Sequence, residues 1–450
     1  MKTQPSTLSC RASATSDAGS VLVIVLWVCL GLVTIGLYFA NSMTYELRAA
    51  DNRVSGISAE QAIAGAERYV SYFLANNSTN GMFPTNQNFN CENVAIGDAH
   101  YWIIGRDPNG EDPNDLHFGL VDEASKLDLN YVNTNAFAYL PNMTFDFAGA
   151  IQDWRGTNGV AQNDYSAQGY IDKNAPLETV DELRLVYGSS VNLLYGDDLN
   201  RNGVLDANEK DTTGTGQLNS GLAEYTTVYI REPNFHVDGT MLTNVSSLRL
   251  SRSELTSLLQ AAGINTGYFK TVTNGYPYAG MLAWAAHCRA AGMTDADVAS
   301  LSTNVTTTTN IYAYGRVNIN TASEDVLVAL FMSLNNGSEQ TAEGDAQTLV
   351  TYREQNPTML TSLAWVYDAL GGNNSTLQLL ERGDYVTTRS FQYTADIAAV
   401  GAYGRGYRRV KFVFDLSDGT PKVIYRQDLS RLGWALGDKV RQTTLANNTQ

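Results

Sequence analysis

The first pattern along the chain is a hydrophobic run without a single charge, residues 21–40. A helix needs about 20 apolar residues to cross the hydrocarbon core of a bilayer. The run is too long for the apolar region of a cleaved secretory signal, and Tyr38-Phe39-Ala40 is a poor cleavage site. The sequence therefore predicts one transmembrane helix that stays in the mature protein.

Helical periodicity continues after this run. Apolar residues recur every three or four positions, with a break near Gln61: Met43, Leu47, Ala50, Val54 and Ile57, then Ile63, Ala66, Val70 and Phe73. Such stripes are typical of an amphipathic helix that packs one face on a soluble domain. We expect one helix over residues 20–75, about 80 Å long at 1.5 Å per residue.

Two segments far apart in the chain alternate like β-strands. Residues 76–145 contain the runs HYWIIG and HFGLVDEASKLDLNYV. Residues 385–435 contain SFQYTADIAAV, YRRVKFVFDL and KVIYRQDL, and Asp418-Gly419 between the last two is a hairpin signal. We expect both segments to form one antiparallel sheet packed on the N-terminal helix.

Helical patterns dominate residues 146–384, between the two strand segments. They cover residues 177–187, 251–262, 278–291, 323–334, 345–355 and 361–370. A helical block between two parts of a sheet is an insertion. The predicted fold class is therefore α+β, with a long N-terminal helix on an antiparallel sheet, a large, mostly helical inserted domain, and a tail at 436–450.

The net charge of the chain limits the kinds of molecule that it is expected to bind. The 450 residues include 46 Asp and Glu against 30 Lys and Arg, a formal net charge of −16. A domain this acidic repels nucleic acid and anionic lipid headgroups, and it attracts divalent cations.

The clearest ligand pattern is DLNRNGVLDANE, residues 198–209, which fills the calcium-loop pattern D-x-[DN]-x-[DN]-G-x5-E. Its oxygen ligands would be Asp198, Asn200, Asn202, the Val204 carbonyl, Asp206 and Glu209. The alternative is an Asn- and Gly-rich surface turn. The preceding helix, 191–195, is short and residues 210–221 are poorly helical, so we expect a single structural calcium loop and not a sensor hand that opens.

Other chemistry is sparse. Cys10 and Cys29 lie before and inside the apolar run, which leaves Cys91 and Cys288 as the candidate disulfide, with two separate buried thiols as the alternative. The four histidines are scattered singly, and the sequence has no HExxH, zinc spacing, G-x-S-x-G elbow or P-loop. We expect a protein that is not an enzyme.

The N-terminus resembles a type IV prepilin leader. Residues 1–19 are polar and end in Gly19, almost directly before the apolar run. The resemblance implies cleavage by a prepilin peptidase after Gly19, which makes Ser20 the methylated N-terminus. An ordinary signal anchor with a glycine at this boundary is the alternative.

Several segments resemble the K-type minor pseudopilin of type II secretion systems, in the family's order, from the leader to about Arg426. They are residues 122–130 (DEASKLDLN), Asp153-Trp154, 173–177 (KNAPL), 180–188 (VDELRLVYG), 317–322 (VNINTA) with Val326-Leu327, then Arg353 and 361–366. The chain reads GVAQN at 159–163, where the family often has Gly-Ala-Glu, which puts any family calcium ligand there in doubt. Residues 210–310 are longer and richer in Thr and Asn than a compact member needs.

One departure agrees with a tip position. Most pilin-like subunits carry Glu at the fifth mature position, where it meets the N-terminal amine of a neighbour, whereas this chain has Ile24. An unpaired charge in the bilayer costs about 3 kcal/mol or more. A subunit with no neighbour above it has no amine to offer a Glu, and the K-type pseudopilin is placed at the fibre tip. The alternative is that Ile24 simply continues an anchor.

The resemblance implies a single-pass inner-membrane protein with its large C-terminal domain in the periplasm. Its partners would be the I-type and J-type minor pseudopilins, the major pseudopilin and the prepilin peptidase; contact with secreted substrates is left open. Alternatives are a type IV minor pilin used as an adhesin, an anchored hydrolase, and a DNA-uptake protein. The last would use a helix-hairpin-helix-like segment at 317–330, which is acidic at Glu324 and Asp325 and lacks a Lys/Arg cluster.

Overall fold

The computed structural model describes residues 18–78, 81–84, 89–107, 115–156, 165–246, 251–274, 277–335 and 338–446. The chain has two compact units, Met1–Ser55 and Gly56–Gln450. Each unit is described by itself below.

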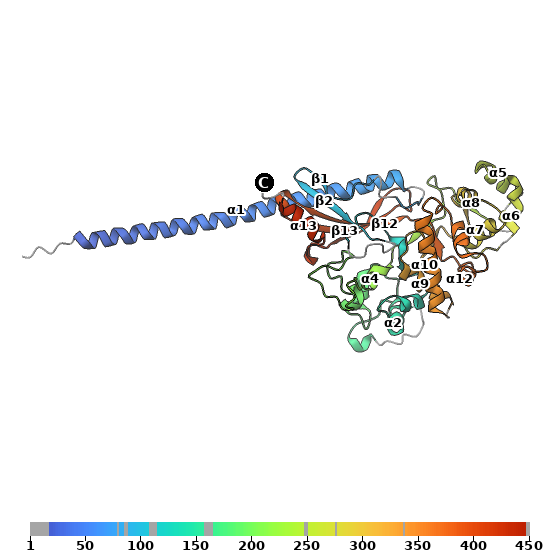
Figure 1. Ribbon diagram of the computed structural model, residues 1–450, viewed down its shortest axis with the longest axis horizontal. Helices are drawn as coiled ribbons and strands as arrows, with labels where there is room; N and C mark the ends of the chain where they lie inside the picture. Colours follow the sequence, from blue (N-terminus) through green and yellow to red (C-terminus); the bar gives the residue numbers. More distant parts are fainter. Residues whose placement is uncertain are drawn as a thin grey trace, which may run out of the picture. The chain divides into compact units, whose positions relative to one another are not determined.

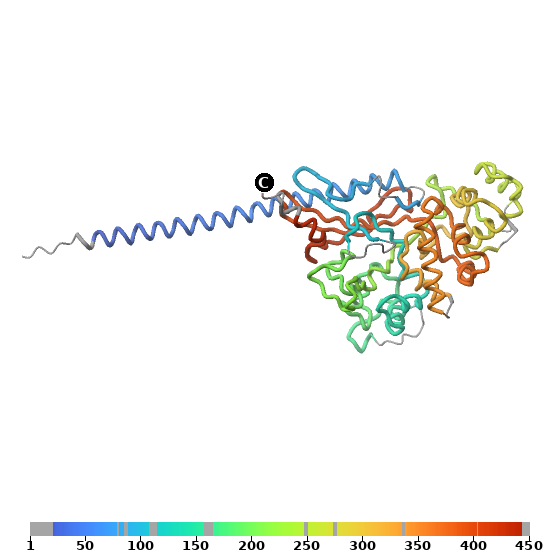
Figure 2. The backbone as a smooth tube through the Cα atoms, viewed as in Figure 1, coloured from blue at the N-terminus to red at the C-terminus, as the bar shows by residue number. Residues whose placement is uncertain are grey.

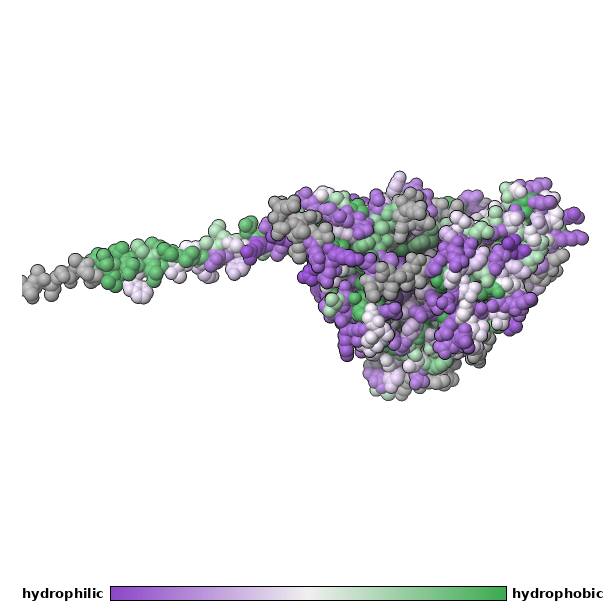
Figure 3. Space-filling view, viewed as in Figure 1, coloured by the Kyte–Doolittle hydropathy of each residue, from purple (hydrophilic) through white to green (hydrophobic). Residues whose placement is uncertain are grey.

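The described part of the first unit is helical. Helix α1 (Ala18–Asn77) begins here and continues into the second unit (Figure 1). Figure 3 shows its apolar residues as a green stretch, and within the described residues it is one helix long and apolar enough to cross a membrane. The prediction of a membrane-length helix is confirmed. The first stripe of the predicted amphipathic helix is exposed, with Met43 at 70 % and Leu47 at 64 %.

The second unit is built on a six-stranded antiparallel sheet. Its strands are β1 (Val94–Ile96), β2 (Ala99–Ile104), β3 (Val121–Asp122), β12 (Gln392–Val400), β13 (Arg408–Asp415) and β14 (Lys422–Asp428). Their order is β1-β2-β12-β13-β14, with β3 paired to one end of β12. The chain leaves the sheet after Asp122 and returns at Gln392, as the trace in Figure 2 shows. The predicted antiparallel sheet, the hairpin at Gly419 and the mixed α+β class are therefore correct.

The two faces of the sheet bury different cores because side chains alternate along a strand. Tyr101 and Ile103 of β2 pack with the second apolar stripe of α1, which includes Ile63, Val70 and Phe73. The neighbouring side chains of β2 point the other way and pack with Ala435 and Leu436, just before α13 (Gly437–Ala446). Only the second predicted stripe is therefore buried against the sheet.

Between residues 123 and 391, the part of the chain that the structure describes contains most of the other helices and four two-stranded sheets. The longer helices are α2 (Phe145–Arg155), α5 (Arg252–Ala261), α7 (Met281–Ala290), α8 (Asp295–Ser302), α9 (Glu324–Asn335) and α10 (Glu339–Gln355). The shorter ones are α3 (Val191–Tyr195), α4 (Leu222–Tyr225), α6 (Phe269–Asn274), α11 (Ala364–Leu370) and α12 (Ser375–Leu380). The two-stranded sheets pair β4 (Leu127–Asp128) with β5 (Thr226–Thr227), β6 (Arg231–Pro233) with β9 (Tyr312–Tyr314), β7 (Thr243–Asn244) with β8 (Val305–Thr306), and β10 (Val317–Asn318) with β11 (Val386–Thr387).

These helices share a hydrophobic core around Trp284, Phe331 and Trp365. Most of the predicted helical segments are helices. Residues 177–187 are the exception, because they contain a 3-10 helix, η5 (Val180–Leu185), in place of an α-helix. Within it the Asp181 carboxylate accepts hydrogen bonds from side chains of α3 and β14, and such tertiary contacts can override a weak helical preference.

Candidate calcium loop

Residues 198–209 form a tight loop closed by their own polar groups. The Asp198 carboxylate accepts hydrogen bonds from the backbone N–H of Asn202 (3.0 Å) and of Gly203 (2.8 Å). Gly203 has φ +86°, and a Cβ there would lie 2.7 Å from Nε of Arg106. Glycine is required at this position because other residues rarely adopt such a conformation.

The predicted ligand side chains converge. Asp206 Oδ2 accepts hydrogen bonds from the side-chain amides of both Asn200 and Asn202 (2.9 Å for Asn202). The Glu209 carboxylate reaches back across the loop and accepts from the backbone N–H groups of Leu199 (2.8 Å), Asn200 and Asp206 (both 3.1 Å). The first and last residues of the motif therefore both close the same loop.

This donor set fits calcium. Asp198, Asn200 and Asn202 are at most 6 % exposed, and an amide that turns over presents oxygen where it now presents nitrogen. Burial raises the pKa of Asp198 to about 6, against the opposing effect of Arg106. No group of three His, Cys, Asp or Glu side chains in the described ranges could hold a metal ion. The loop's three carboxylates, Asp198, Asp206 and Glu209, do not form such a group here, and the finding does not test calcium binding, for which Asn side chains and a backbone carbonyl are also predicted ligands. Calcium stays a prediction.

Two arginines attach the loop to the sheet. Arg106, which follows β2, donates to the carbonyl oxygens of Arg201 (3.3 Å) and Asn202 (3.2 Å) and pairs with Glu224 at 2.6 Å. Arg409 of β13 donates to the carbonyl oxygens of Asn200 and Arg201. The backbone of the loop is therefore hydrogen-bonded to arginines from the end of β2 and from β13, both far from it in the sequence.

The loop also contacts the segment before α13. The side-chain amide of Asn200 donates to the carbonyl oxygen of Trp434, and that of Asn202 donates to the carbonyl oxygen of Ala435, both at 3.2 Å. The motif itself carries no signal for these partners, since they lie more than 200 residues away. The loop thus joins the inserted region to both the sheet and the C-terminal segment.

Calcium should stabilise the fold through Glu209. Single structural loops bind with a Kd of about 0.1–1 mM, so a calcium concentration 100-fold above Kd would add about 2.7 kcal/mol to the free energy of unfolding. We expect Glu209→Gln to remove most of the calcium-dependent rise in Tm, measured by thermal unfolding with calcium and with a chelator. Glu343→Gln, an exposed residue of α10, should leave that rise unchanged. An equal rise in both variants would contradict the assignment.

The other predicted site residues are more scattered. Gly19 and Ser20 lie in the first turn of α1, and Cys10 lies outside the described residues. Cys91 is a half-buried free thiol beside the helix–sheet core, whereas Cys288 is a free thiol in the core of the helical region. The candidate disulfide is not formed, because the two side chains belong to different hydrophobic cores. Burial raises the pKa of the Cys288 thiol to about 12.

Polar groups of the segment at 317–330 form hydrogen bonds with other parts of the fold. Asn318 Nδ2 donates to Asp122 Oδ2 at 2.8 Å, and the buried Arg353 donates to the carbonyl oxygens of Ile319 (3.2 Å) and Ala322 (2.7 Å). The Arg353 guanidinium is thus engaged with backbone oxygens, and that of Arg316, which directly precedes the segment, is paired with Glu232 and Asp384. These contacts favour a packing role for the helix-hairpin-helix-like segment.

Comparison with known proteins assigns no family. The sequence matches no protein-family model, and no curated protein is similar enough to it to count as a relative.

Proposed function

We propose that the chain is a K-type minor pseudopilin that lies at the tip of a type II secretion pseudopilus and starts or caps the fibre. The observation that carries the proposal is helix α1. It is apolar enough to cross a membrane over its first half, and its second half packs on an antiparallel sheet through Ile63, Val70 and Phe73. A simple membrane anchor has no need of such a continuous helix.

The segments that resemble the K-type family also bond to one another. Asp122 of the first segment accepts hydrogen bonds from Asn318 and Thr321 of the VNINTA segment. Asn130 is bonded to the backbone of Leu177 in the KNAPL segment, through its oxygen at 2.8 Å and its nitrogen at 2.9 Å. The segments that carry the resemblance are therefore in contact in this fold, which supports reading them together and not as isolated motifs.

The tip position is supported by Ile24. A subunit inside the fibre has a neighbour above it whose N-terminal amine can pair with a carboxylate, and a tip subunit has none. Isoleucine avoids an unpaired charge in the bilayer. The proposed partners are the I-type and J-type minor pseudopilins and the major pseudopilin, with the large domain of this chain in the periplasm.

Calcium has a structural role in this proposal. It would be held by Asp198, Asn200, Asn202, the Val204 carbonyl, Asp206 and Glu209, and when bound it would neutralise the loop's carboxylates. Arg106 and Arg409 hold the backbone of the same loop against the sheet. The loop would thereby fix the inserted region to the pilin-like part of the chain.

The mature N-terminus tests the proposal. In cells with a prepilin peptidase, mass spectrometry should find cleavage after Gly19 and a methylated Ser20. Gly19→Val should retain the leader, whereas Gly31→Val, a matched change within the helix where a Cβ meets no other atom within 4 Å, should be processed normally. An intact Met1 in the unaltered protein would remove the chain from the pilin class.

Copurification separates the two pilus systems. We expect the processed protein to form a complex with the I-type and J-type minor pseudopilins of its host. Isolation with the major pilin of a type IV pilus instead would favour the adhesin alternative.

A further inference from the structure

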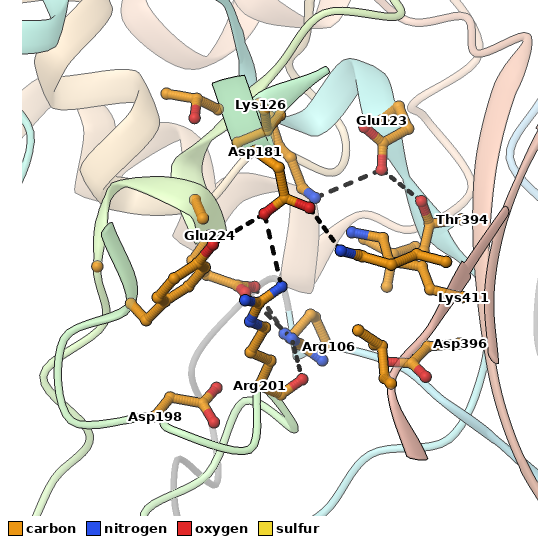
Figure 4. Close-up of a pocket in the computed structure, with 18 of the residues that line it drawn as sticks. Arg106, Glu123, Lys126, Asp181, Asp198, Arg201, Glu224, Thr394, Asp396 and Lys411 are labelled. Carbon is orange, nitrogen blue, oxygen red and sulfur yellow. Dashed lines mark hydrogen bonds and ion pairs between the residues drawn. The ribbon is translucent and has the colours of Figure 1, made fainter. Parts of the chain in front are cut away.

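A cavity lined by both charged and apolar side chains lies beside the candidate calcium loop, between the sheet, α4 and η5 (Figure 4). Its volume is about 90 Å³, which is room for several water molecules at roughly 10–15 Å³ each. Charged side chains of both signs line it: the cationic ones are Arg106, Lys126, Arg201 and Lys411, and the carboxylates are Glu123, Asp181, Asp198, Glu224 and Asp396. The Asp181 and Glu224 side chains each remain 28 % exposed, so the lining is accessible from solvent.

Two of these side chains have donors to spare. Lys126 is 9 % exposed at its side chain, and its ammonium contacts Glu123 Oε1 at 3.4 Å. Lys411 of β13 points into the same cavity, and none of the described residues accepts a hydrogen bond from its ammonium. Each ammonium can donate three hydrogen bonds. The described residues therefore take up only a small part of this capacity.

The carboxylates around the lysines already have partners. Glu123 accepts hydrogen bonds from the hydroxyls of Thr227 and Thr394 as well as from Lys126. Glu224 is paired with Arg106, and Asp396 with Arg409. These acceptors do not satisfy Lys411.

The two ammonium groups also act on each other. Burial lowers the pKa of Lys411, and the positive charges of Lys126 and Arg106 lower it further, against the opposing negative charges of Glu123 and Asp396. A ligand that carries negative charge and accepts several hydrogen bonds would relieve both effects, because charge-assisted hydrogen bonds are stronger than neutral ones. Tyr229 adds another donor on the lining, since none of the described residues bonds to its hydroxyl.

We propose that this cavity binds a small oxyanion such as phosphate, held by the ammonium groups of Lys126 and Lys411 and by the Tyr229 hydroxyl. A small ligand is required by the cavity volume. The monohydrogen form of phosphate also fits the mixed charge, because its P–OH can donate to a neighbouring carboxylate while its other oxygens accept from the lysines. The inference goes beyond the proposed function and does not depend on it.

Calorimetric titration of the full-length protein with inorganic phosphate tests the proposal, in calcium-free buffer with sodium chloride as the ionic-strength control. We expect saturable binding to the unaltered protein. Lys411→Met and Lys126→Met should each weaken it about tenfold or more, since each removes a charge-assisted hydrogen bond. Lys422→Met is the matched control, because that lysine is 57 % exposed at its side chain on β14, and binding should not change.

The outcomes are distinct. Equal phosphate binding by the Lys411→Met and Lys126→Met proteins would place the anion elsewhere and overturn the proposal. No phosphate binding by the unaltered protein would overturn it as well, leaving water in the cavity. Circular dichroism of each variant shows whether it is folded, and Lys411→Arg, which keeps the charge, should retain part of the affinity if the charge is what binds.

Discussion

Replacing Arg409 by methionine should lower the free energy of unfolding by about 3–5 kcal/mol. Arg409 is fully buried, and its guanidinium pairs with both carboxylate oxygens of Asp396, at 2.8 and 2.6 Å. Methionine fills part of the volume but leaves Asp396, itself 5 % exposed, as a buried charge without its partner. The variant also frees two backbone carbonyls of the calcium loop. Urea unfolding of the protein in mild detergent, followed by tryptophan fluorescence, measures the loss.

The preceding residue offers a matched control. Arg408 pairs with Glu60 of α1 at 3.0 Å, but the two side chains are 38 % and 57 % exposed. Exposed ion pairs contribute about 0–1 kcal/mol, so Arg408→Met should have a small effect. Adding Asp396→Leu to Arg409→Met should recover much of the loss, since it removes the unpaired charge. Similar decreases in the free energy of unfolding for the Arg408 and Arg409 variants would show that the buried Arg409–Asp396 pair contributes no more to stability than the exposed pair.

The elements with local periodicity could be predicted from the sequence. The runs that became β12, β13 and β14 alternate over seven to nine residues, and Gly419 at φ +81° forms the turn between the last two. The alternation predicts one exposed face, whereas β12 is buried at each position because both faces of the sheet are covered, one by α1 and the other by the segment before α13. The second apolar stripe of α1 was equally clear in the sequence, and the structure packs that face of the helix on the sheet.

What the sequence could not indicate depends on contacts between distant residues. The first stripe of α1 has the same spacing as the second, yet Met43 and Leu47 are exposed. Periodicity describes one helix face and does not say whether anything covers it. Likewise, Asp198 to Glu209 could be recognised by spacing, whereas Arg106 and Arg409, which hold that loop, have no fixed separation from it.

The charged cavity was also missed, for a related reason. Lys126 belongs to a segment recognised for its family resemblance, and Lys411 appeared only as a polar position in an alternating strand. The fold brings them to the same cavity from distant parts of the chain, Lys126 from the turn before β4 and Lys411 from β13. A lysine in a turn or a strand pattern predicts solvent exposure, so these two lysines give no signal of a site until the fold is assembled.

Replacing Glu224 by glutamine should destabilise the protein by roughly 3 kcal/mol at pH 7 and by less than half of that at pH 3. Burial alone would raise the pKa of Glu224, but the guanidinium of Arg106 and the charge of Lys126 lower it to about 2, from an ordinary value of 4.5. A carboxyl whose folded pKa is lowered stabilises the fold above its unfolded pKa, and that stability is lost as the pH falls from about 4.5 towards 2. Glutamine does not ionise, so the difference between the two proteins should shrink in acid.

Urea unfolding at several pH values between 3 and 7 measures this difference. The buffer should contain no calcium, because release of a bound ion in acid would add a second pH dependence. Glu343→Gln, on the exposed face of α10, should differ little from the unaltered protein at either pH. A Glu224→Gln penalty that stays constant with pH would mean that Glu224 acts through packing and hydrogen bonding. A shrinking penalty would mean that the charge pair with Arg106 fastens the end of β2 to α4 beside the calcium loop.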